Sequence, residues 1–212
     1  MQPSARKTWK QNPDAVRGDI LRVAISVFSE SGLKGGRIEE IVALTKTSKR
    51  MIYYYFGDKE GLYRAALEAA YGRIREAESQ LDLAGVEPVM ALARLVRFTF
   101  DHHRENTDLV RLVMIENVHR AAHLSDSEVI RSVNAGAISD LENLVKRGIA
   151  AGAFRADLDA MMLHWQISAQ CFFNVSNRPT FSALYGDALF RDPEQERLRE
   201  EVVRTILGYA RA

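Results

Sequence analysis

The sequence predicts an all-α protein, with a small basic helical part at the N-terminus and a larger helical part after it. Apolar residues recur three and four positions apart along most of the chain, and no stretch alternates convincingly with the period of two that strands require. Residues 1–60 carry eleven Lys and Arg against seven Asp and Glu, whereas residues 61–212 carry eighteen against twenty-one. This uneven charge indicates that the N-terminal part is suited to bind a polyanion and that the rest of the chain has a different function.

Three helices are predicted in the basic part. Asn12 and Pro13 form a favourable helix start, because a side-chain cap precedes a proline at the first helical position, and this helix ends at Gly32. Residues 37–45 carry apolar side chains at helical spacing. A short turn at residues 46–48 follows, and Ser48 caps a third, short helix with polar and basic groups. A helix, a tight turn and such a helix form a helix-turn-helix.

The third helix contains three consecutive tyrosines, residues 53–55, shortly after Lys49 and Arg50. Successive residues of a helix point about 100° apart, so the three rings cannot all be buried. The first or the third of them is expected to pack inside, and Phe56 is expected in the core. The remaining hydroxyl groups and the two cations suit phosphate oxygens and base edges.

Residues 17–62 resemble the DNA-binding domain of the TetR family of transcriptional regulators. The matching positions form an Ile-Leu-x-x-Ala-x-x-x-Phe helix, a glycine turn, a Ser-capped recognition helix with Tyr and Phe, and a Lys-Glu-x-Leu helix start. They are Ile20, Leu21, Ala24, Phe28, Gly32, Ile41, Ser48, Ile52, Tyr53, Phe56, Lys59, Glu60 and Leu62. The resemblance implies a homodimeric repressor that binds a double-stranded DNA operator and is released from it by a small-molecule effector.

The resemblance also implies which side chains contact DNA, with the helix at residues 48–55 in a major groove. The side chains expected nearest the bases are those of Lys49, Arg50 and Met51. Those expected on phosphates are Ser48, Tyr53, Tyr54 and Lys59, with Arg37 and Lys46 as additions.

The turn departs from the family pattern. Residues 45–47 are Thr-Lys-Thr where the family usually has Ala-Gly-Val, and Val42 replaces its usual alanine. A lysine at the glycine position implies one of two structures. Lys46 is either a left-handed residue, at a steric cost of roughly 1 kcal/mol, or part of a turn with a different shape.

The chain is predicted to contain a flexible basic arm at residues 1–12, the helix-turn-helix domain at 13–58, and a helical regulatory and dimerisation domain at 59–212. The arm either contacts DNA or is a solvated tail. Residues 178–191 are predicted to form a long loop. Helices are predicted in the third part near residues 59–80, 87–104, 107–120, 125–151, 158–177 (starting at Asp157 or Asp159) and 193–210.

In the TetR family the last two helices form a four-helix interface between subunits, which implies the helices near 158–177 and 193–210 here. Both have wider apolar surfaces than a monomeric helix usually needs. The other helices would surround an effector pocket, and plain core packing is the alternative for each residue assigned to it. Residues 110–117 also resemble a segment of TetR regulators of pyrimidine and nicotinate utilisation. The candidate pocket residues, chosen as aromatic or polar groups on predicted inward faces, are Phe98, His102, Met114, Asn117, Trp165 and Phe172.

Catalytic and cofactor motifs are missing from the sequence, which has no Walker loop, no Gly-x-Gly-x-x-Gly turn, no Gly-x-Ser-x-Gly elbow and no His-Glu-x-x-His. We therefore predict neither an enzyme nor a cofactor. His119 and His123 lie four residues apart, but no cysteine or close carboxylate joins them, and no metal site is predicted. Cys171 is interpreted as a small buried hydrophobe, with a redox sensor as the alternative.

A single cysteine excludes an internal disulfide and fits a reducing cytoplasm. No apolar run approaches the roughly 18 residues that cross a bilayer, and the first residues lack the apolar segment of a signal peptide. The expected location is the cytoplasm, without membrane association. Two other function classes stay open: an enzyme with an unrecognised helical active site, and an architectural DNA-binding protein without an effector.

Overall fold

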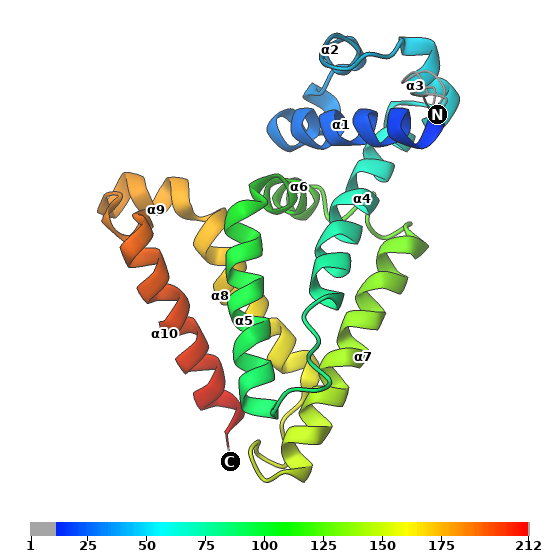
Figure 1. Ribbon diagram of the computed structural model, residues 1–212. Coiled ribbons are helices and arrows are strands. Elements are labelled where there is room, and N and C mark those ends of the chain that lie inside the picture. Colours follow the sequence, from blue (N-terminus) through cyan, green and yellow to red (C-terminus); the bar gives the residue numbers. More distant parts are fainter. Residues whose placement is uncertain (1–11, 212) are drawn as a thin grey trace, which may run out of the picture. The chain divides into compact units, whose positions relative to one another are not determined.

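The computed structural model describes residues 12–211, and in this range every named element is a helix (Figure 1). The predicted arm lies outside the described residues except for Asn12. The chain divides into two compact units: unit 1 has the described residues up to Ala70 and Arg111–Ser127, and unit 2 has Tyr71–Val110 and the described residues from Glu128. The elements are α1 (Pro13–Gly35), α2 (Ile38–Leu44), α3 (Lys49–Phe56), α4 (Lys59–Ser79), α5 (Pro88–Glu105), α6 (Thr107–Val118), α7 (Glu128–Ala150), α8 (Ala160–Ser176), α9 (Arg178–Tyr185), the 3-10 helix η2 (Ala188–Phe190) and α10 (Asp192–Ala210).

The helix starts of the structure follow the capping residues of the sequence. The Asn12 side chain accepts a hydrogen bond from the amide of Ala15 at 3.2 Å, and Ser48 Oγ accepts one from Met51 at 3.4 Å. Asp159, rather than Asp157, caps α8, since its carboxylate accepts from the amide of residue 162 at 2.7 Å. These bonds satisfy amide groups that have no partner within the helix.

Unit 1 has a core of large apolar side chains from α1 to α4. Ile20 and Phe28 of α1, Ile41 of α2 and Ile52 of α3 are fully buried. Tyr63 of α4 is also fully buried, and its ring meets the Phe28 ring edge-on at 5.2 Å. The residues at helical spacing in the sequence therefore form this core.

Two backbone features shape unit 1. Gly32 has φ 65° and interrupts the helical backbone within α1, where the sequence predicts the helix to end. Lys46 does not have a positive φ. Of the two structures predicted for the turn, the left-handed lysine is therefore wrong, and the turn differs in shape from the one usual in the family. Thr45 instead leaves α2 with an extended backbone and its hydroxyl donates to the carbonyl of Ile41 at 2.8 Å.

Unit 2 is built around α5, which packs against α7, α8 and α10. Its core contains Leu92, Val96 and Phe100 of α5 together with side chains of the three surrounding helices. Gly148 of α7 is required by a close approach, because a Cβ atom there would lie 2.0 Å from the ring of Phe154. None of the helices among the described residues is apolar and long enough to cross a bilayer.

Two predictions about local structure are wrong. Residues 178–191 are not a long loop, since α9 and η2 lie within them. Phe181 is stacked near Tyr185, one helical turn away, and near the ring of Phe190, so packing among aromatic side chains stabilises this short helix. Phe56 is half-buried rather than a core residue, and the guanidinium of Arg17 lies 5.5 Å from its ring centre.

Candidate DNA-binding surface and ligand cavity

The second and third helices of unit 1 form a helix-turn-helix. Ile41 and Ile52 anchor α2 and α3 in the core and leave the opposite side of α3 in solvent. The helix starts at the Ser48 cap and ends at Gly57, whose φ of 78° turns the chain into α4. Gly61, in the first turn of α4, lies so close to the carbonyl oxygen of Phe56 that a Cβ atom would stand 2.1 Å from it. The connection from α3 to α4 is therefore tight.

The side chains predicted to contact DNA lie mostly on the solvent side of this motif. Arg37, Lys46, Ser48, Lys49 and Arg50 are exposed, whereas Met51 and Lys59 are partly buried. In the tyrosine run, Tyr54 is 77% exposed and Tyr53 is 38% exposed. Tyr55 is half-buried, with its ring near those of Tyr54 and Phe56, so the third tyrosine is the one that turns inward.

Lys49 does not point freely into solvent. Its ammonium group donates to the Glu39 carboxylate of α2 at 2.6 Å and lies 5.9 Å from the centre of the Tyr53 ring. The hydrogen bond that Lys49 donates to Glu39 raises the pKa of Lys49 above its ordinary value, and the same bond lowers the pKa of Glu39. Glu39 was not predicted as part of this surface, since an acid ten residues before a lysine gives no local signal across a turn.

Lys59 is oriented by the N-terminal helix. Its ammonium group donates to the backbone carbonyl of Lys34 at 3.2 Å. A lysine ammonium carries three donors, so two N–H groups of Lys59 stay available for a phosphate. The helix dipole of α4 adds a partial positive charge at this same end of the helix.

A buried polar network that the sequence did not reveal lies elsewhere in unit 1. Glu116 of α6 is fully buried and accepts the Tyr63 hydroxyl at 3.0 Å. It also accepts the backbone amides of His123 and Leu124 at 3.0 and 3.2 Å, and lies 3.0 Å from His123 Nδ1. Burial alone would raise the pKa of Glu116, but the hydrogen bonds from His123 and Tyr63 outweigh it and leave this pKa below its usual value.

This network gives the two histidines, His119 and His123, different surroundings. His123 holds Glu116 and stacks edge-on near Tyr63, with ring centres 5.1 Å apart, while His119 is exposed. Among residues 12–211 no three His, Cys, Asp or Glu side chains are close enough together to hold a metal ion. Cys171 is buried, and burial raises the pKa of its thiol to about 12.

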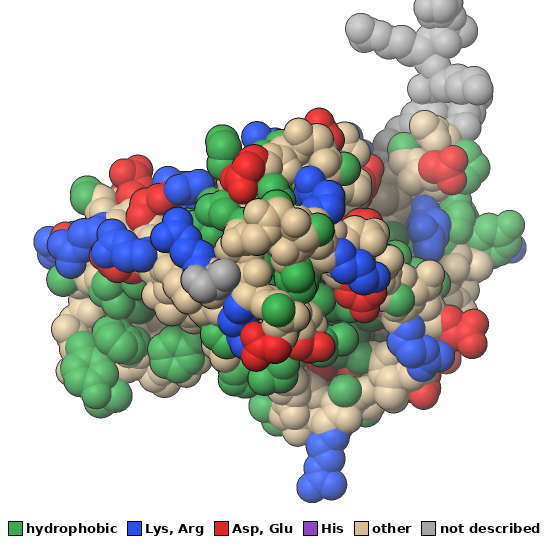
Figure 2. Space-filling view, turned by 90° about the horizontal axis from the view of Figure 1, so that it is seen from below, with side chains coloured by type: hydrophobic (Ala, Val, Ile, Leu, Met, Phe, Trp, Pro, Cys, Tyr) green, Lys and Arg blue, Asp and Glu red, His purple; other side chains and the backbone are tan. Residues whose placement is uncertain are grey.

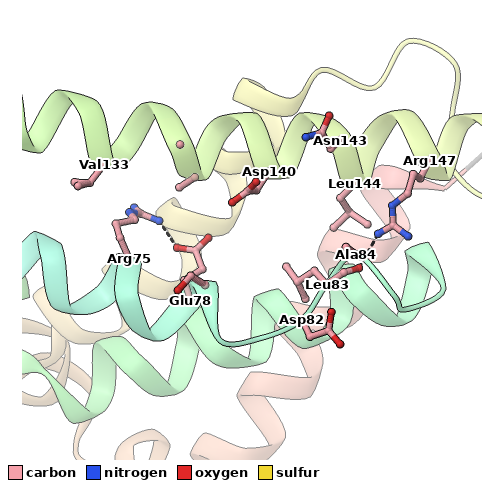
Figure 3. A pocket seen from close by; sticks show the side chains of 13 residues that line it. Arg75, Glu78, Asp82, Leu83, Ala84, Val133, Asp140, Asn143, Leu144 and Arg147 are labelled. Atoms are coloured by element: carbon pink, nitrogen blue, oxygen red, sulfur yellow. Dashed lines mark hydrogen bonds and ion pairs between the residues drawn. The ribbon is translucent and has the colours of Figure 1, made fainter.

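Unit 2 contains a cavity of about 600 Å³ between the end of α4, the segment after it, and α7. Figure 3 shows Arg75 and Glu78 of α4 pointing toward α7, and Asp140 of α7 pointing back toward them. Arg147 closes one end, because its guanidinium donates to the carbonyls of Leu83 and Val86 at 2.7 and 2.9 Å. Apolar side chains complete the wall: Leu83, Ala84, Val133, Ala137 and Leu144.

The side chains predicted to line an effector pocket do not line this cavity. In unit 2, Phe98 and His102 stack one helical turn apart with ring centres 5.3 Å apart, and Phe172 meets His103 at 6.3 Å. Trp165 is 62% exposed. Met114 and Asn117 belong to unit 1, and Asn117 is exposed, so the expectation that Asn117 is a buried polar group is wrong.

One face of α8 has large apolar side chains in solvent. Met161, Met162, Trp165 and Phe173 are all more than half exposed, and they recur at helical spacing over three turns. The space-filling view shows hydrophobic side chains at the surface close to groups of Lys and Arg (Figure 2). Exposed apolar side chains that recur along one helix are typical of a contact surface.

Comparison with known proteins supports the same organisation. Residues 20–66 match the family model of the "Bacterial regulatory proteins, tetR family", and residues 88–206 match the "Tetracyclin repressor-like, C-terminal domain". The chain is 38% identical over 183 residues to the transcriptional repressor NicS of Pseudomonas putida, covering 86% of each chain. It is 28% identical over 210 residues to the transcriptional regulator RutR of Escherichia coli K12, covering 98% of this chain and 97% of RutR.

Solved structures share the fold. The regulator FadR of Bacillus subtilis, determined in complex with stearoyl-CoA, superposes with a TM-score of 0.68 at 17% sequence identity, over 91% of this chain and 98% of that one.

Proposed function

We infer that this chain, which belongs to the TetR family of bacterial transcriptional regulators, is a repressor that binds its operator through α3 and is released by a small-molecule effector. It is a regulator of transcription and not an enzyme. The observation that carries the proposal is the solvent-exposed face of α3, where Arg50 and Tyr54 stand free beside Lys49. A short helix with this face fits the major groove of DNA.

The exposed side chains would contact different parts of the DNA according to their chemistry. Arg50, Lys49 and Met51, near the start of α3, would be nearest the base edges, because recognition helices present their N-terminal residues to the bases. The hydroxyls of Ser48, Tyr53 and Tyr54 and the ammonium of Lys59 would hold phosphates, with Arg37 and Lys46 as further phosphate contacts. Phosphate contacts fix position and carry no sequence information directly.

Two copies of the chain would bind the two halves of an operator. The exposed apolar face of α8, together with α10, is the surface that we assign to a second copy. The repressor would work in the cytoplasm. An effector releases it from DNA only if it binds more tightly to a conformation that does not fit the operator.

The cavity in unit 2 favours an effector over the architectural alternative. A DNA-binding protein without an effector has no need for a space of about 600 Å³ in its second unit. Small-molecule sites commonly have this size and combine apolar walls with a few polar groups.

A comparison of three proteins on two kinds of DNA tests the proposal. An operator is first selected from random duplexes, and affinities of wild type, Arg50→Ala and Tyr54→Phe are measured on it and on a scrambled duplex. Arg50→Ala should lose about 1–3 kcal/mol on the operator and much less on the scrambled duplex. Tyr54→Phe should weaken both similarly, because its contact is to phosphate. Equal losses on both duplexes for Arg50→Ala would remove Arg50 from the base-reading set.

A further inference from the structure

A second, smaller cavity of unit 2 lies where α9 and η2 connect the end of α8 to the start of α10 (Figure 1). We call it the α9 pocket, and its volume is about 240 Å³. An apolar cavity of about 150 Å³ is enough to hold one benzene molecule. The α9 pocket therefore has room for a single ring that carries a small substituent. Apolar side chains form most of its wall: Phe173 of α8, Phe181 of α9, Leu189 and Phe190 of η2, and Leu198 and Val202 of α10.

The polar side chains of the α9 pocket all come from one face of α8. Gln170, Asn174 and Asn177 line it, and residues at these spacings of four and three are neighbours on a helix surface. Of the described residues that line the pocket, none has an ionisable side chain. A charged ligand would lose its hydration here without meeting an opposite charge, so the ligand should be neutral.

A second buried amide holds Asn174 in place. Asn174 Nδ2 donates to Oε1 of Gln195 on α10 at 2.8 Å, and Gln195 Nε2 donates back to Asn174 Oδ1 at 3.1 Å. Gln195 Nε2 also donates to the carbonyl of Leu189 at 3.0 Å. A backbone carbonyl can only accept, so this bond fixes the orientation of the Gln195 amide and, through it, that of Asn174. Both side chains are more than nine-tenths buried, and the pair forms a fixed part of the wall.

This amide pair leaves one donor over. The Asn174 side chain carries two N–H groups, and within residues 12–211 only the one bonded to Gln195 has a recorded partner. A buried N–H without an acceptor is unfavourable. Gln170 lines the pocket one helical turn earlier, and no hydrogen bond of its side chain is recorded in the described range. The pocket therefore offers hydrogen-bond donors to an acceptor on a ligand.

We propose that the α9 pocket binds a small neutral aromatic molecule with a carbonyl group. The carbonyl oxygen accepts from the second N–H of Asn174, and the ring lies among the phenylalanines of the wall. Phe181 and Phe190 already meet edge-on at 5.8 Å, and aromatic rings at such distances pack favourably with a further ring. The α9 pocket shares no lining residue with the larger cavity beside α7, and binding there does not depend on DNA.

NMR titration of the full chain with acetophenone, α-methylstyrene and benzoate tests the proposal. The three probes have nearly the same shape, but α-methylstyrene lacks the acceptor and benzoate is charged. The backbone amide signals of Leu189 and Phe190, which line the pocket, report its occupancy. We expect acetophenone to shift both signals to saturation and to bind at least about tenfold more tightly than benzoate. Unmoved signals, or benzoate binding as tight as that of acetophenone, would overturn the proposal.

A double variant tests the hydrogen bond. Asn174 and Gln195 are replaced together, because a single change would leave the other amide buried without its partner. In Asn174→Leu/Gln195→Met the ratio of acetophenone affinity to α-methylstyrene affinity should fall at least about fivefold. This ratio is measured because the different hydration of the two probes cancels between wild type and variant. A ratio equal to that of the wild type would contradict the role of Asn174.

Three single variants test the location. Leu198→Trp should fill the pocket and weaken acetophenone binding at least about tenfold. Leu207→Trp changes another partly buried leucine of α10 that packs against the same core, and should leave binding unchanged. Gly136→Trp should also leave it unchanged. Gly136 lines the larger cavity, and a Cβ atom there meets no other atom within 4 Å.

Loss of binding in Gly136→Trp but not in Leu198→Trp would place the ligand in the larger cavity and overturn the proposal. A crystal structure in which a side chain of a second copy fills the α9 pocket would also overturn it. If Leu198→Trp does not fold, the wild-type titration decides, since the signals of Leu189 and Phe190 must respond to acetophenone.

Discussion

The hydroxyl of Tyr63 on α4 donates to the carboxylate of Glu116 on α6 at 3.0 Å, and both side chains are fully buried. The two residues are 53 positions apart in the chain. Glu116 also holds the backbone after α6, where Arg120 and Ala121 have the positive φ values of 59° and 56°. Such values are unfavourable for residues other than glycine and persist only where surrounding contacts enforce them. The Glu116 network is therefore what holds this connection in shape.

Tyr63→Phe should lower the free energy of unfolding by about 1.5–3 kcal/mol, because it leaves a buried carboxylate with one donor fewer. Urea unfolding at pH 7 measures the loss. Ser127 donates to Glu68 at 2.8 Å in the same unit, outside the Glu116 network. Replacing Ser127 with alanine provides the comparison variant. A Tyr63→Phe variant as stable as wild type would show that the bond to Glu116 contributes nothing.

The same network predicts an acid dependence. The pKa of Glu116 is lower in the folded chain than its ordinary value of 4.5, so the stabilisation is present above pH 4.5 and is lost as the pH falls through the folded pKa. Glu116→Gln cannot ionise and should lack this dependence. The free energies of unfolding of both proteins, measured between pH 7 and pH 3, should therefore converge at the acid end. A constant difference between the two free energies over this range would contradict the lowered pKa of Glu116.

Glu39→Gln should strengthen binding to any DNA duplex, because it frees the ammonium of Lys49 for a phosphate. Exposed ion pairs are weak, so we expect a gain of roughly two- to fivefold at low salt that fades as salt rises. Glu40→Gln removes the same charge from the adjacent exposed residue, which has no recorded ion pair within residues 12–211. If both variants gain equally, the effect is general charge and not release of Lys49.

Trp165→Glu should separate the proposed dimer, because it places a charge in the centre of the apolar face of α8. Light scattering measures the mass, and operator affinity should fall with it since two linked half-site contacts become one. Val129→Glu, at another apolar position that is more than half exposed, on α7, is the control and should stay dimeric. A Trp165→Glu chain that remains a dimer would place the interface elsewhere. Deletion of α10 is a poorer test, because Val202, Val203 and Ile206 belong to the core.

Cys171 should not react with thiol reagents in the folded chain. Only the thiolate is reactive, and a pKa of about 12 leaves very little of it at neutral pH. Labelling should therefore follow unfolding, and its rate in increasing urea should rise with the unfolded fraction. Rapid labelling under native conditions would revive the alternative of a redox sensor.

The sequence by itself determined most of the helices and most of the outward face of the recognition helix. A cap such as Asn12, Ser48 or Asp159 acts on amides within three residues, and the inward or outward direction of a side chain follows from helical spacing. These are local properties, so they can be read before the fold is known. The family resemblance of residues 17–62 depends on the same local spacing.

Only the tertiary structure decided which polar side chains meet. Tyr63 with Glu116, Lys49 with Glu39, and Arg75 with Asn134 join separate helices, and no rule of spacing links such residues. The helix α9 was missed for the same reason, since contact of Phe181 with Phe190 stabilises a segment whose composition favours a loop. Asn117, assigned to a pocket from its helical face, is exposed because a face of α6 becomes interior only where another helix covers it. Capping bonds depend on neighbouring residues in the sequence, whereas burial and charge pairing depend on how distant segments pack.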